Sequence, residues 1–153
     1  MWCATPPPAI DGLLRLADYV LPNYIEFRNL GGSDGADHLT AETLLRRCAS
    51  PDAAVIVKRP SGIWHYRHHG DELVADFYGH TTLASPAIKD ATGAGDVFAA
   101  GLLAVLARDR DNTEHGARLG LRLAKHKLQH VGTTGHNQFA ELARGPIQAQ
   151  QAG

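Results

Sequence analysis

The sequence predicts an α/β fold with a mostly parallel central sheet, a β-hairpin and flanking helices. A continuous apolar run over 53–57 is typical of a strand that is buried on both faces. Two strand-like runs flank Gly70 and Asp71, a pair of residues that favours a hairpin turn. Two long helical segments follow, so that the order of strands and helices is that of an α/β domain.

The elements before the hairpin can be assigned in order. Apolar residues at helical spacing predict a short helix over 10–17, and a short strand over 18–21 should end at Pro22. A glycine-containing loop over 29–37 should lead to a helix over 40–48, with Thr40 as its N-cap. The later strands are expected over 53–57, 63–68, 73–78 and 87–89, and the later helices over 95–107, 113–131 and 139–143.

The last two long helices differ in pattern. The helix over 95–107 is apolar on nearly all sides, which predicts a buried helix. The helix over 113–131 should end at Gly132. It should face the core with one stripe of residues, namely Ala117, Leu121, Ala124, Leu128 and Val131.

Composition narrows the class of protein. The chain has 153 residues, and 15 Lys+Arg against 16 Asp+Glu give a net charge of −1. This balance argues against a nucleic-acid partner, which normally requires a basic excess. No stretch has the apolar length of a membrane span, and the N-terminus has no signal-peptide pattern. Cys3 and Cys48 form no CxxC pair, so neither a disulfide framework nor a cysteine zinc site is expected. We therefore expect a cytoplasmic protein without nucleic-acid or membrane partners.

The segment over 89–101 carries the strongest chemical signal. Gly93, Ala94 and Gly95 precede an apolar helix and leave N–H groups uncovered at its start, where an anion can be held. Asp96 would lie beside this anion and could accept a proton from an attacking hydroxyl. An ordinary glycine-rich turn is the alternative. A P-loop and a dinucleotide fingerprint are excluded, because no GxxxxGK[ST] occurs and Phe98 replaces the third glycine.

The run D-A-T-G-A-G-D over 90–96, with the small-residue helix after it, resembles the C-terminal signature of the ribokinase-like (PfkB) carbohydrate kinases. Asn23 and Glu26 resemble the N-x-x-E motif of the same family, although this spacing is also typical of a helix cap. The resemblance implies the C-terminal portion of a ribokinase-like three-layer fold. It also implies ATP-dependent transfer of a phosphoryl group to a hydroxyl of a sugar or similar small molecule, with ATP as co-substrate and Mg²⁺ as cofactor.

The resemblance assigns the site residues as follows. Asp96 is the general base, and the backbone of Gly93, Ala94 and Gly95 stabilises developing negative charge. Asn23 and Glu26 act on Mg²⁺ through water. The nucleotide-binding residues are Asn23, Lys58, Gly62, Gly132 and Thr133.

The resemblance covers only the second half of the family's fold. We therefore expect a partial kinase domain over 1–143 and a disordered tail over 144–153. One hypothesis is a carbohydrate kinase that acts on a sugar or a nucleoside-like substrate. The other is a truncated, non-catalytic fragment that at most binds nucleotide or a partner protein. A sheet without its neighbouring strands would also favour self-association into a homo-oligomer.

Overall fold

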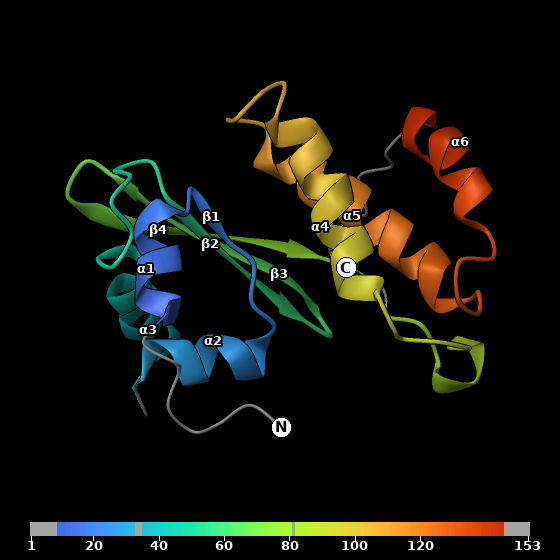
Figure 1. The fold of residues 1–153 in the computed structure, drawn as a ribbon, viewed down its shortest axis with the longest axis horizontal. Helices are drawn as coiled ribbons and strands as arrows, with labels where there is room; N and C mark the ends of the chain where they lie inside the picture. Colours follow the sequence, from blue (N-terminus) through green and yellow to red (C-terminus); the bar gives the residue numbers. More distant parts are fainter. Residues whose placement is uncertain (1–8, 33–34, 81, 146–153) are drawn as a thin grey trace. The chain divides into compact units, whose positions relative to one another are not determined.

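The computed structural model describes residues 9–32, 35–80 and 82–145 (Figure 1). The chain divides into two compact units, Met1–Phe77 and Tyr78–Gly153, and each is described here by itself. Of the tail expected over 144–153, residues 146–153 lie outside the described residues.

In its described residues the first unit holds three helices and a four-stranded sheet, whose last strand ends just beyond the unit. In chain order the elements are α1 (Ala9–Leu16), β1 (Tyr19–Val20), α2 (Tyr24–Gly31), α3 (Asp37–Leu45), β2 (Ala54–Arg59), β3 (Gly62–His69) and β4 (Glu72–Gly79). The strand order is β1-β2-β3-β4, with β1 parallel to β2 and β2 antiparallel to β3. The fold is α/β as predicted, but the sheet is only partly parallel, whereas the sequence predicts a mostly parallel one.

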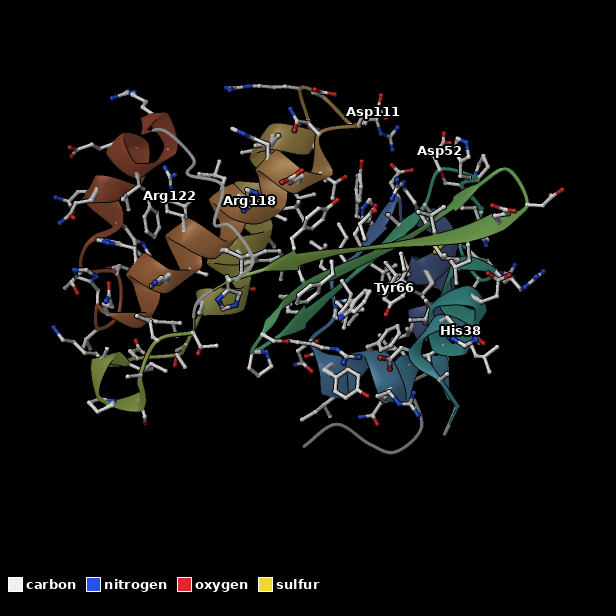
Figure 2. The ribbon with its side chains drawn as sticks, turned by 180° about the vertical axis from the view of Figure 1, so that it is seen from behind. His38, Asp52, Tyr66, Asp111, Arg118 and Arg122 are labelled. Carbon is white, nitrogen blue, oxygen red and sulfur yellow. The ribbon has the colours of Figure 1, made fainter. Side chains whose placement is uncertain are left out.

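The core of the first unit forms around β2. Its residues Ala54, Val55, Ile56 and Val57 are at most 3% exposed, which confirms the strand buried on both faces. The ring of Phe27 on α2 stacks on Tyr66 of β3, with ring centroids 6.0 Å apart. Figure 2 shows the side chain of Tyr66 in this unit. The hairpin between β3 and β4 is also confirmed, with its turn at Gly70 and Asp71.

The helices of this unit depart from the prediction in two places. Residues 24–31 form α2, so the loop expected over 29–37 is shorter. The helix expected to begin at Thr40 begins at Asp37, so Thr40 is not its N-cap. The carboxylate of Asp37 is held by ion pairs with Arg28 and Arg59 in the first turn of α3, where negative charge is favourable. Thr40 is instead fully buried.

The second unit is helical. Its elements are η1 (Ser85–Ala87), α4 (Ala94–Leu106), α5 (Thr113–Leu128), η2 (His136–Gln138) and α6 (Phe139–Arg144). The last strand predicted, over 87–89, is wrong. Ala87 ends a 3₁₀ turn, and the N–H of Lys89 donates to the carbonyl of Leu128 at 2.8 Å. The backbone that would pair in a sheet is therefore bound to the end of α5.

Helices α4 and α5 lie side by side (Figure 1), and glycine residues allow them to approach closely. A Cβ atom added to Gly120 would lie 2.6 Å from the carbonyl oxygen of Phe98.

The predicted stripe on α5 is only partly right. Ala117 is buried, but Val131 is 62% exposed and lies beyond the helix. The buried residues of α5 are Thr113, Gly116, Ala117, Leu119, Gly120, Leu123 and Lys127.

Helix α4 is also less buried than its composition predicts. Its buried residues are Phe98, Gly101, Leu102 and Leu106. Leu103, in contrast, is 41% exposed. The apolar character of this helix therefore exceeds what packing on α5 requires.

Candidate active site

The predicted anion site lies at the start of α4. Gly93 is the N-cap and has a left-handed backbone, with φ of 76°. The N–H groups of Gly95 and Asp96 lie in the first helical turn, where no preceding helical carbonyl can accept them. A Cβ atom added to Gly93 would meet no atom within 4 Å, so the backbone is open to a ligand. Asp96 lies exposed in the same turn. This arrangement suits an anion beside a carboxylate.

Asp90 connects this loop to the end of α5. Its Oδ1 accepts a hydrogen bond from the N–H of Thr92 at 2.9 Å. Its Oδ2 accepts from the N–H of Gly132 at 2.9 Å and from Nζ of Lys127 at 3.1 Å. The N–H groups of Gly132 and Thr92, and then the Lys127 ammonium, hold the pKa of Asp90 far below its usual range. Asp90 is therefore ionised at neutral pH.

The same bonds place the turn after α5 against the loop. Gly132 has a φ of 57°, and its N–H reaches Asp90. Thr133 follows it, and both residues are exposed. The second unit thus brings Gly132 into contact with the segment over 90–96, and Thr133 is the next residue in the chain.

The remaining predicted site residues lie in the first unit. Oδ1 of Asn23 accepts a hydrogen bond from the N–H of Glu26 at 2.9 Å, and Oε2 of Glu26 accepts from the N–H of Asn23 at 2.8 Å. These two bonds form a capping box at the start of α2. Asn23 and Glu26 therefore do form the helix cap that is the alternative interpretation of N-x-x-E. The cap uses only one carboxylate oxygen of Glu26. Mg²⁺ in phosphate sites needs only one or two carboxylates beside the phosphates, so the residue pair fits an indirect metal role.

Lys58 and Gly62 lie near this cap. Asn23 forms a β-bridge with Lys58, and the N–H of Lys58 donates to the carbonyl of Pro22 at 3.0 Å. Gly62 faces Arg59 in the register of β2 and β3. Arg59 is paired with Asp37, whereas Lys58 has no ion pair within the described part of the chain. The Lys58 ammonium is therefore the more available cation for an anionic ligand.

The residues in the described ranges offer no ready-made metal cage. No group of three or more His, Cys, Asp or Glu side chains that could hold an ion occurs among them. No helix in these ranges is both long and apolar enough to cross a membrane.

Comparison with known proteins decides the family. The pfkB family carbohydrate kinase profile matches residues 2–139. The chain belongs to the pfkB family of carbohydrate kinases. The segment over 90–96, predicted to be the signature of this family, lies within the match. No curated protein matches the chain.

Solved structures of pfkB-type kinases share the fold. The ribokinase II candidate of E. coli, in complex with ATP and Mg²⁺, is similar at a TM-score of 0.68 and 20% identity, over 88% of this chain and 40% of that one. Adenosine kinase from Schistosoma mansoni, in complex with 2-fluoroadenosine, has a TM-score of 0.65 and 19% identity, over 82% and 38%. The PfkB protein from Polaromonas sp. JS666 has a TM-score of 0.63 and 24% identity, over 92% and 42%. The chain is therefore ribokinase-like in fold, and it spans less than half the length of each.

Two residues of the described site were not predicted as functional from the sequence. Asp90 begins the signature, and an Asp that caps the N–H two residues later is a common turn signal. Lys127 gives no such signal, because a lysine in a helix is normally expected at the surface. The one hint that Lys127 is buried is its position four residues after Leu123, since residues four apart lie on the same face of a helix and Leu123 is buried.

Proposed function

We propose that this pfkB chain carries the ATP-binding and base-bearing part of a kinase that phosphorylates a hydroxyl of a sugar or nucleoside. The main support is the start of α4, where the open backbone of Gly93 and the exposed carboxylate of Asp96 share one helical turn. An anion and an attacking hydroxyl can be held side by side there. Because ATP is the donor, we expect the reaction to take place in the cytoplasm.

In the proposed mechanism, the oxygen of the acceptor hydroxyl attacks the γ-phosphorus of ATP while Asp96 accepts the proton of that hydroxyl. The bond between the γ-phosphorus and the β–γ bridging oxygen breaks, and ADP leaves. The N–H groups of Gly95 and Asp96 stabilise the negative charge on the transferred group, together with the backbone of Gly93. The N–H of Ala94, also predicted to contribute, donates to the carbonyl of Ala91.

The other predicted residues would hold the nucleotide. In the first unit these residues are Lys58 and Gly62, and in the second unit they are Gly132 and Thr133. Asn23 and Glu26 would hold Mg²⁺ through water. The ion would supply positive charge to the β- and γ-phosphates.

The names of two similar solved structures support a class of acceptor. One solved structure is a ribokinase from Thermotoga maritima, and another is an adenosine kinase with 2-fluoroadenosine. These names suggest acceptors that carry a pentose, either free or as a nucleoside.

The substitution Asp96→Asn tests the proposal. Loss of a general base should lower kcat by about 10²–10⁴-fold. Affinity for ATP should change by less than about threefold, because backbone groups hold the phosphates. Turnover is measured against a panel of pentoses and nucleosides, and ATP binding by calorimetry. Asp111→Asn is the matched control, since Asp111 is an exposed carboxylate outside the proposed site (Figure 2). Near-normal turnover of Asp96→Asn would remove Asp96 from the mechanism.

One observation favours the second candidate, a non-catalytic fragment. The chain spans only 38–47% of the length of similar solved kinases, such as those from S. mansoni and T. maritima. Positioning of the acceptor contributes much of the rate in such reactions. ATP binding without turnover of any acceptor would support this candidate.

A further inference from the structure

Lys127 is a lysine buried inside the second unit. Its side chain is only 4% exposed. Three oxygen atoms lie within hydrogen-bond distance of Nζ: Oδ2 of Asp90 at 3.1 Å, the carbonyl of His130 at 3.2 Å and the carbonyl of Asp90 at 3.4 Å. An ammonium group has three donors, so each can be used.

These contacts join two segments that are 37 residues apart in the chain. Asp90 begins the loop that leads into α4, and His130 belongs to the turn that follows α5. The N–H groups of Lys89 and Asp90 donate to the carbonyl of Leu128, which strengthens the same junction. Burial of a charged amine is costly unless it is paired and hydrogen-bonded, so the position of Lys127 needs these partners.

We propose that Lys127 is a positioning residue of the nucleotide site. Its ammonium compensates the charge of Asp90, and Asp90 in turn holds the N–H groups of Thr92 and Gly132. One ion pair thereby fixes both the loop before α4 and the turn that carries Thr133. This role in nucleotide binding rests on the proposed function, whereas the role in holding the loop does not.

Loss of the ammonium would act on the site in two ways. The carbonyls of Asp90 and His130 would lose a donor inside the unit, which loosens the junction. The carboxylate of Asp90 would also lose its cation. Because the N–H two residues later, at Thr92, bonds to this carboxylate, an uncompensated negative charge would lie close to the loop that receives the phosphates. Both effects weaken the binding of an anionic ligand.

The test is a double-mutant cycle with Lys127→Met and Asp90→Asn in the 153-residue chain. Two quantities are measured for each variant: amide hydrogen exchange of Thr92 and Gly132 without nucleotide, and ATP affinity with Mg²⁺ by calorimetry. Lys127→Met should speed exchange of both amides and weaken ATP binding by about tenfold or more. In the Asp90→Asn background the same change should have a smaller effect than in the unaltered chain, because the part of its effect that depends on the Asp90 carboxylate is already lost. Lys125→Met, on the same helix but only half-buried, is the control and should change neither quantity.

Two results would overturn the proposal. One is a Lys127→Met chain whose amide exchange matches that of Lys125→Met. The other is a cycle in which the effects of Lys127→Met and Asp90→Asn on ATP affinity multiply, as they would for two independent residues. Should Lys127→Met fail to fold, Asp90→Asn alone decides: protected amides at Thr92 and Gly132 in that variant would show that the ion pair does not hold them. A chain that binds no ATP would contradict the proposed function, and the exchange rates would still decide the structural role.

Discussion

Asn23 and Glu26 illustrate how one residue pair can fit two roles at the residue scale. Their side chains and backbones form the reciprocal cap of α2. The same pair is the predicted magnesium motif. The cap depends on hydrogen bonding, whereas a metal role depends on the negative charge of Glu26, so a change of charge alone separates them.

Glu26→Gln makes this separation. Glutamine at this position also forms a capping box, so the free energy of unfolding should change by less than about 0.5 kcal/mol. The Mg²⁺ concentration needed for half-maximal ATP binding should rise, because the carboxylate charge is lost. Glu26→Ala, as comparison, removes half of the cap and should cost about 1 kcal/mol. An unchanged Mg²⁺ titration in Glu26→Gln would mean that the motif is only a cap.

The residues of the site were predictable to different degrees. The sequence predicts a role for Gly93 and Asp96, because small residues before an apolar helix have few purposes other than a tight turn or an anion site. Lys127 was missed because its burial depends on Asp90, which lies 37 residues earlier. A pairing between distant segments leaves no periodic signal in the sequence.

At the scale of elements, the packing of α4 on α5 depends on glycine. The Cβ of an alanine at Gly101 would lie 2.8 Å from Cα of Gly120. At Gly116 it would lie 2.9 Å from a methyl group of Leu102. The two backbones therefore approach more closely than larger residues allow, and this contact carries the loop over 90–96 at one end.

Gly120→Ala should for this reason destabilise the chain. Alanine favours a helix by about 1 kcal/mol over glycine, but the added methyl would lie 2.6 Å from the carbonyl oxygen of Phe98. We expect a net loss of about 1–3 kcal/mol in the free energy of unfolding, typical of overpacking. Gly12→Ala in α1, where nothing lies within 4 Å, should stabilise by about 0.5–1 kcal/mol. Urea unfolding followed by circular dichroism measures both, and equal signs would contradict the packing argument.

Elements with a strong local pattern were predicted correctly, among them β2, the hairpin and α4. The errors have tertiary causes. Helix α3 begins early because Asp37 meets two arginines, one of which is 22 residues away on β2. The segment over 87–89 is not a strand because the end of α5 takes its backbone bonds. Neither partner can be identified from the local sequence.

At the scale of the whole chain, the surface bears several large apolar side chains. On α1, Leu13 is 67% exposed and Leu16 is 85% exposed, and on α2, Ile25 is 72% exposed. The two-residue strand β1 stands at one edge of the sheet. Exposed apolar side chains and open edges favour contact with other chains.

The purified chain should therefore self-associate. Size-exclusion chromatography with light scattering should give a mass above that of one chain, rising with concentration. Replacing Leu13 and Leu16 together by lysine should lower this mass, since both side chains face solvent on a single helix. A stable monomer over the whole concentration range would contradict the expectation and would show that the exposed residues need no partner.

The central claim is that the start of α4 receives the phosphates of ATP, and its most direct test is a titration followed by the amide resonances of the chain. With ATP and Mg²⁺ the largest shifts should occur at Gly93, Gly95 and Asp96, followed by Gly132 and Thr133. Amides of α1 should not shift, and Gly93→Ala should weaken the response, because φ of 76° is unfavourable for alanine. Saturable shifts confined to these amides are the predicted result. Unchanged resonances at Gly95 and Asp96 at millimolar ATP would contradict the claim.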